Sequence, residues 1–190
     1  MKQLFLSLLS ILFAIPVFAQ QTWTVDNPHS NVRFEVGWQD FSVRTGEFKT
    51  FSGTLETESL ADLSDAKIKF VVDAASVDVI AERLAMKIKS DAFLNVEAHP
   101  EIVFESTGLK KISDNNYVST GKLTICGVEK EQEVSVLFKG EKETRKGDIF
   151  GIEVKLEVDR TQFGLDWARP RLGDNIILVG HLLYGQEVKE

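Results

Sequence analysis

Residues 150–158 read Phe-Gly-Ile-Glu-Val-Lys-Leu-Glu-Val, and this stretch decides the class of fold. Every second side chain is apolar, and those between are glycine or charged. Successive side chains of a β-strand point to opposite faces, so the alternation predicts a strand with one face in a core and the other in water. Strands of this half-buried kind are typical of antiparallel sheets.

The same alternation recurs on both sides of this stretch along the chain. Its apolar positions are Val32, Phe34, Val36 and Trp38, then Ile68, Phe70, Val72 and Ala74, then Val134, Val136 and Phe138. Hairpin signals rich in glycine and asparagine follow at 114–116, Gly127 and 146–148. We count about eight strands, which predicts an all-β fold. Periodicity alone leaves a sandwich and a closed barrel open, because both bury one face of each strand.

One segment, residues 79–94, departs from this pattern. Its apolar residues Ile80, Leu84 and Ile88 recur every four positions, which is helical spacing. We therefore expect one short helix between two strands, placed as a cap over one end of a barrel.

Residues 1–19 have the layout of a secretory signal. Lys2 precedes an apolar run to Pro16, and the small residues needed for cleavage end at Ala19. The run is shorter than the roughly 20 residues that a membrane span needs. We expect cleavage before Gln20, a single domain over 20–190 and a periplasmic or secreted location. No cysteine lies near the cleavage point, so no lipid anchor is expected.

The charge and the cysteine content exclude several classes of function. Loss of Lys2 takes the formal net charge from −7 to −8, and an acidic domain lacks the basic surface that nucleic acids and anionic membranes require. The single cysteine, Cys126, cannot form an internal disulfide. No activating base stands near it in the sequence, so we interpret it as a small buried or half-buried residue.

Six blocks of sequence, in order, resemble the YceI-like family. They are 23–34 (Trp-Thr-Val-Asp, then His-Ser-Asn-Val and Phe34), 46–53 (Gly-Glu-Phe, then Phe-Ser-Gly), 75–94 (Ala-Ser-Val-Asp, then Lys-Ser-Asp-Ala-Phe-Leu), 99–107 (His-Pro-Glu-Ile-Val-Phe-Glu-Ser-Thr), 121–128 (Gly-Lys-Leu-Thr-Ile-Cys-Gly-Val) and 158–165 (Val-Asp-Arg-Thr-Gln-Phe-Gly-Leu). The chain departs from the family pattern at residues 37–40, where relatives often carry a histidine. Contacts to a ligand head group are therefore not carried over.

The resemblance implies an extended antiparallel lipocalin-like barrel, exported to the periplasm, with a lipid in its lumen. The implied ligand is a polyisoprenoid, an isoprenoid quinone or a fatty-acid-like lipid, held for transport, storage or a stress response. The alternative is a stress-induced structural or interaction barrel whose own side chains fill the core. A homodimer is compatible with either reading.

Aromatic and aliphatic residues on the apolar faces are the candidates for contact with the ligand. Of thirteen phenylalanines, ten lie after residue 19. Burying each methylene-like group contributes about 0.8 kcal/mol, so a lipid can bind without polar anchors. The predicted lumen residues are Phe34, Val36, Phe70, Phe93, Phe104, Phe163, Leu165 and Trp167. For any single ring, a place in the protein's own core explains the pattern equally well.

Arg160 is the charged residue of most interest. It could meet a polar head group at the barrel mouth, or it could bond backbone carbonyls at a chain corner, and we favour the structural role.

No catalytic residue, metal site or cofactor is expected. The sequence contains no nucleophile elbow, phosphate loop or zinc-protease helix. The three histidines, His29, His99 and His181, lack the spacing of a metal site. We therefore predict a binding protein and not an enzyme.

Overall fold

The computed structural model describes residues 20–186, which form strand segments, short 3-10 turns and one α-helix. The strand segments are β1 (Gln21–Val25), β2 (Asn31–Trp38), β3 (Ser42–Phe48), β4 (Phe51–Thr57), β5 (Lys67–Asp73), β6 (Val77–Asp78), β7 (Glu101–Ser113), β8 (Asn116–Ile125), β9 (Val128–Thr144), β10 (Gly147–Asp159) and β11 (Leu172–Gln186). The helices are α1 (Glu82–Lys89) and the 3-10 turns η1 (Asn27–His29), η2 (Leu63–Asp65), η3 (Ala74–Ser76) and η4 (Arg160–Phe163).

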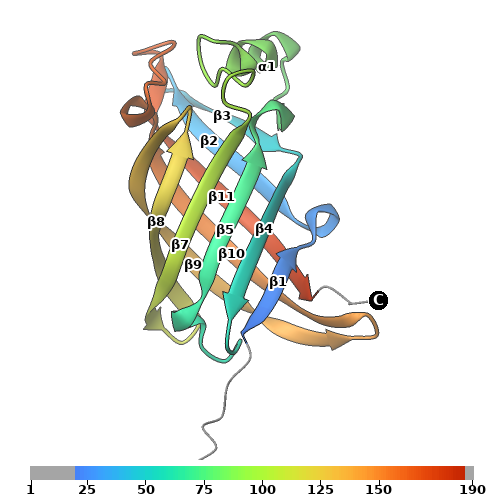
Figure 1. Cartoon of the computed structure of the whole chain (residues 1–190). Coiled ribbons are helices and arrows are strands. Elements are labelled where there is room, and N and C mark those ends of the chain that lie inside the picture. The colour runs from blue at the N-terminus through green and yellow to red at the C-terminus, as the bar shows by residue number, and fades with distance from the viewer. Residues whose placement is uncertain (1–19, 187–190) are drawn as a thin grey trace, which may run out of the picture.

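The segments close into one antiparallel barrel (Figure 1). Both β1 and β2 pair with β11, so together they form one interrupted strand beside it. In the same way β3 continues β4, and β6 continues β5, because each pair lies along the same neighbouring strand. The result is a closed barrel of eight strands in simple up-and-down order. This confirms the predicted all-β lipocalin-like barrel of about eight strands.

The three interruptions lie side by side and are joined by hydrogen bonds. The Asn27 side chain accepts from the Phe51 N–H at 3.0 Å and donates to the Lys49 carbonyl at 3.2 Å. The Lys49 N–H donates to the Ser76 carbonyl at 3.2 Å. The wall therefore bends at one level, which no alternation of apolar residues could predict.

The helix covers the end of the barrel beyond this bend (Figure 1). Here β6 pairs with β3, and no strand among residues 20–186 pairs with its other edge. Residues 79–100, which include α1, follow at that edge. Ile88 of α1 is buried and Leu84 packs against the core, as predicted. The helix is shorter than the predicted span of 79–94, because Ile80 precedes it with a fully exposed side chain and turns follow Lys89.

The predicted alternation is borne out in the buried faces of the strands. In β10 the side chains of Phe150, Ile152 and Val158 are buried, and the expected hairpin turns separate β7, β8, β9 and β10. The predicted signal segment, 1–19, lies outside the described residues. Within residues 20–186, no helix has the length and apolar character that a membrane crossing requires.

Candidate functional site

The interior of the barrel holds two apolar cavities. The first, which we call the helix-end cavity, has a volume of about 120 Å³ and is lined by α1, β2, β3 and the neighbouring ends of β10 and β11. The second, the central cavity, has a volume of about 110 Å³ and lies among β5 and β7 to β11. Ile102, Leu123, Leu156 and Leu178 line both, so the two cavities share a wall. Their arrangement gives the barrel one apolar interior in two compartments.

Glycines in the barrel wall make room for phenylalanine rings beside them. Without that room, the rings would project into the cavities. Phe34 of β2 faces Gly46 of β3, and Phe70 of β5 faces Gly53 of β4. A Cβ atom at Gly46 would lie 2.4 Å from Phe34 Cζ, and one at Gly53 would lie 2.6 Å from Phe70 Cδ2. The rings therefore lie against the wall, over the glycines.

The third such pair joins two further inward-facing residues. A Cβ atom at Gly121 of β8 would lie 2.6 Å from Cζ of Phe104 on β7. Rings that fold over a glycine of the adjacent strand occupy less of the lumen than rings that project from it. This geometry gives a physical reason why two apolar cavities remain inside a barrel rich in phenylalanine.

Seven of the eight predicted lumen residues line one of the cavities. Phe34, Val36, Phe93, Leu165 and Trp167 line the helix-end cavity, and Phe70 and Phe104 line the central cavity. Contact with a ligand stays a prediction for all seven. The eighth, Phe163, lines neither cavity. It belongs to η4, where strand alternation has ended, and its buried ring packs into the protein's own core.

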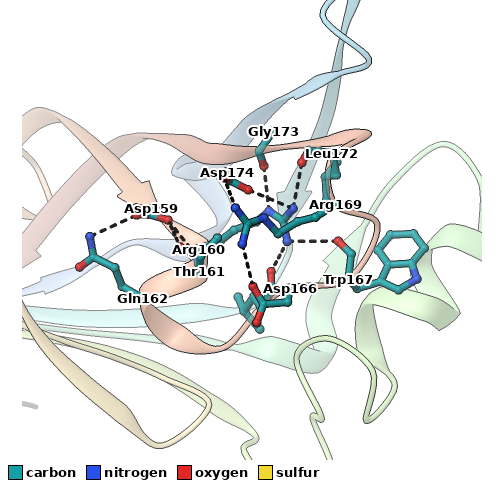
Figure 2. A network of polar contacts seen from close by, with 11 residues as sticks. Asp159, Arg160, Thr161, Gln162, Asp166, Trp167, Arg169, Leu172, Gly173 and Asp174 are labelled. Carbon is teal, nitrogen blue, oxygen red and sulfur yellow. Dashed lines mark hydrogen bonds and ion pairs between the residues drawn. The ribbon is translucent and has the colours of Figure 1, made fainter.

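Arg160 occupies the chain corner that follows β10 (Figure 2). Its side chain is fully buried, and its Nε donates to the Gly173 carbonyl at 2.8 Å. Nη2 donates to the Leu172 carbonyl at 2.9 Å, and Nη1 donates to the carbonyls of Leu165 and Trp167. Burial lowers the pKa of the guanidinium, and Asp174, 3.6 Å away, opposes that shift.

The sequence around Arg160 explains the corner. Asp159 accepts hydrogen bonds from the backbone N–H and the hydroxyl of Thr161, at 3.0 and 2.7 Å. Gly164 ends the turn at φ +77°, a conformation that other residues rarely adopt. The arginine then ties residues 165–173 back onto the end of β10. Although it borders the helix-end cavity, its donors are committed to backbone carbonyls, as the structural interpretation predicted.

Arg44 of β3 is a charged residue of the lumen that the sequence analysis missed. It lines the helix-end cavity and stacks on the Trp38 ring, with Cζ 4.0 Å from the ring centroid. Its Nε is buried and has no hydrogen-bond partner among residues 20–186. The signal was present in the sequence, since Arg44 shares its strand phase with the buried Phe48, but the short alternation of β3 did not single it out.

The central cavity carries few polar groups. The buried Ser119 hydroxyl donates to Ser106 Oγ at 2.6 Å, so its acceptor is another hydroxyl and not a base. Tyr184 is fully buried and stacks on Phe150, with ring centroids 4.9 Å apart. Burial raises the pKa of the Tyr184 hydroxyl, which therefore stays protonated. The Tyr184 hydroxyl has no hydrogen-bond partner among residues 20–186.

Cys126 is half-buried in the turn between β8 and β9, as predicted from the sequence. Its Sγ lies 3.2 Å from the Leu94 carbonyl, and burial raises the pKa of the thiol. Strand phase alone would point the thiol away from the buried face. The turn places Cys126 at φ +50°, so the thiol instead faces the segment after α1.

Each of the three histidines has a different neighbour. His29 Nδ1 is 2.8 Å from Asp26 Oδ2, His181 Nδ1 is 3.8 Å from Glu153 Oε2, and His99 packs against Gly127. In the part of the chain that the structure describes, no group of three or more His, Cys, Asp or Glu side chains could hold a metal ion.

The family model for the YceI-like domain matches residues 23–184. Among curated proteins, a UPF0312 protein of Azotobacter vinelandii is 31% identical over 141 residues, which cover 74% of this chain and 73% of the relative. Protein YceI of Salmonella newport is 31% identical over 126 residues, 65% of each chain.

Solved structures share the fold. Burkholderia cenocepacia BcnA superposes with a TM-score of 0.74 at 22% identity, over 84% of this chain and 98% of that one. A polyisoprenoid binding domain from Saccharophagus degradans superposes with a TM-score of 0.62 at 12% identity, over 86% of this chain and 98% of that one.

Proposed function

The chain belongs to the YceI-like domain family, and on that premise we propose that its barrel binds a long apolar lipid without changing it chemically. The observation that carries the proposal is the pair of apolar cavities with a shared wall. An isoprenoid chain fits this interior by its chemistry, because it is apolar throughout its length.

The size of the cavities supports a ligand that spans both. An apolar cavity of about 150 Å³ stays dry and accepts a guest the size of benzene. Each of the two cavities here is slightly smaller, at about 120 and 110 Å³. One compartment alone suits a short apolar group, whereas a lipid tail would use both by displacing side chains at the shared wall.

The Saccharophagus domain, named for polyisoprenoid binding, supports this class of ligand by analogy of fold. A binding role also agrees with the lumen chemistry, because the polar groups described above are committed to structural hydrogen bonds or lack a neighbouring base. We therefore propose a carrier or a store for lipid, acting in transport, storage or a stress response, and not an enzyme.

Extraction of the purified protein with organic solvent, followed by mass spectrometry, tests the proposal. We expect a stoichiometric lipid with a long apolar chain. Since a ligand that binds only the folded state raises stability by mass action, the loaded protein should melt at a higher temperature than the delipidated protein. If no lipid is extracted and added lipid leaves the Tm unchanged, the barrel is filled by its own side chains and the alternative function stands.

We further propose that the protein acts outside the cytoplasm, in the periplasm or as a secreted protein. The support is the signal layout of residues 1–19. Protein exported by a bacterial host should have an intact mass that begins at Gln20, and a mass that retains residues 1–19 would contradict this location.

A further inference from the structure

Two arginines border the helix-end cavity, and they differ in what their donors contact. The Arg160 guanidinium donates to four backbone carbonyls and lies 3.6 Å from Asp174. The Arg44 guanidinium forms no ion pair within residues 20–186, and its buried Nε has no acceptor there. Of the two arginines that line this cavity, the one available to a ligand is therefore Arg44.

Arg44 is held in place without being neutralised. It lies opposite Val36 of β2, near the hairpin that joins β2 to β3. Its guanidinium stacks on Trp38, and such a cation–π contact orients the group while leaving its in-plane N–H donors free. A guanidinium has five donors, no acceptor and a permanent charge, so a buried Nε without an acceptor is unfavourable until an acceptor arrives.

We propose that Arg44 binds the head group of the lipid, and that this head group is an anion with acceptor oxygens, a carboxylate or a phosphate. This inference rests on the proposed lipid-binding function and fixes the orientation of the ligand within it. The head group lies beside Arg44 and Trp38 at the α1 end, and the tail extends past Leu156 and Leu178 into the central cavity.

The charge pattern of the wall agrees with this orientation. Among residues 20–186, no arginine or lysine lines the central cavity, and the neutral Ser119 and Tyr184 are among its few polar residues. An anionic head group placed there would be desolvated without a counter-charge, which is strongly unfavourable. A guanidinium pairs with a carboxylate or a phosphate through two parallel, charge-assisted hydrogen bonds. Hydrogen bonds to a neutral ester are weaker.

Binding of matched lipids to the delipidated mature protein tests the proposal. The probes are hexadecanoic acid, its methyl ester and hexadecyl phosphate, which share one tail length. For the wild-type protein we expect the better of the two anionic probes to bind at least tenfold more tightly than the ester, since a hydrogen bond to a charged group is typically worth that ratio or more. The comparison of the two anions shows whether carboxylate or phosphate is preferred.

Variants assign the preference to Arg44. Arg44→Gln should reduce the ratio between anion and ester to within about threefold, mainly by weakening the anion, and Arg44→Lys should restore part of it because the charge remains. The matched control is Arg33→Gln. Because Arg33 lies on the exposed face of β2, this substitution should leave the ratio of anion to ester affinity unchanged.

Two outcomes would overturn the inference while leaving the lipid-binding function intact. One is equal affinity of the wild-type protein for the anions and the ester, which would indicate a neutral head group. The other is a folded Arg44→Gln protein that keeps the preference for anions. If none of the three probes binds and no lipid is extracted, it is the lipid-binding function itself that fails.

Discussion

At the scale of single residues, hydrogen bonding distinguishes the two arginines that line the helix-end cavity. Arg160 and Arg44 are chemically identical, yet one is surrounded by carbonyl oxygens and the other lies beside an indole ring. A buried guanidinium whose N–H donors all have acceptors contributes to stability. A guanidinium whose buried donor lacks an acceptor is available for binding. Substitution of Arg160 should therefore lower stability, and substitution of Arg44 should alter ligand binding.

Arg160→Met should destabilise the fold. The change leaves the carbonyls of Leu165, Leu172 and Gly173 without their donors, and removal of one side of a buried charged network typically costs about 3–5 kcal/mol. Denaturant unfolding measures the loss. The control is Arg169→Met, whose exposed ion pair with Asp174 should contribute at most about 1 kcal/mol.

One result would instead favour the other interpretation of Arg160, in which it contacts a polar head group at the barrel mouth. If Arg160→Met keeps nearly the full free energy of unfolding but loses co-purified lipid, the side chain acts on the ligand and not on the corner.

At the scale of elements, pairs of strands determine how much space the lumen has. The glycines of β3, β4 and β8 lie under phenylalanine rings of neighbouring strands, so the volume of the cavities depends on residues that have no side chain. A ring over a glycine also covers the exposed backbone of that position, which is a recognised way to stabilise a glycine within a sheet.

Gly53→Ala should reduce the lipid content of the protein. The new Cβ would lie 2.6 Å from Phe70 Cδ2, and because the atoms it meets belong to side chains, the ring should move into the central cavity while the wall stays intact. We expect at least half of the extractable lipid to be lost, with a destabilisation of about 1–3 kcal/mol, as for other overpacked cores.

The control for this element is Gly37→Ala in β2. A Cβ at Gly37 would have no neighbour within 4 Å, so lipid content should stay at the wild-type level. Unchanged lipid in both variants would mean that the Phe70 ring does not limit the space for the ligand.

At the scale of the whole molecule, the barrel has two unlike ends. The helix end carries α1, the stacked Arg44 and Trp38 and the corner held by Arg160, while the opposite end is filled by packed rings such as Trp23, Phe150 and Tyr184. A ligand of the proposed kind would therefore enter head-last at the helix end, and its length would be limited by the depth of the central cavity.

Leu156→Trp should shorten the lipid that the protein accepts. Leu156 lines both cavities, so a larger side chain there should block the passage between them. Affinities for saturated fatty acids of increasing length should rise with length in the wild-type protein and reach a plateau at a shorter length in the variant. Leu156→Met, which conserves volume, serves as the control and should cost less than about 1.5 kcal/mol of stability. The same length profile in both variants would contradict a lumen that spans the two compartments.

The sequence by itself determined the class of fold and most of the lumen. Alternation over residues 150–158 and its repeats predicted half-buried antiparallel strands, because the period of two is a local property of the chain. The same phase identified Phe34, Val36 and Phe70 as inward-facing, and the resemblance to a known family decided for a barrel over a sandwich. Phe163 lies outside both cavities because it belongs to η4, beyond the end of the alternating strand.

Only the tertiary structure decided how the inward-facing residues share the interior. Whether a ring fills the lumen or lies over a glycine depends on the register between strands, such as Phe34 opposite Gly46, which a single strand does not encode. The partners of Arg160 come from residues 165–173, and the lack of a partner for Arg44 depends on everything around it. Local spacing places a side chain on a face, but hydrogen bonding and free volume are properties of the closed barrel.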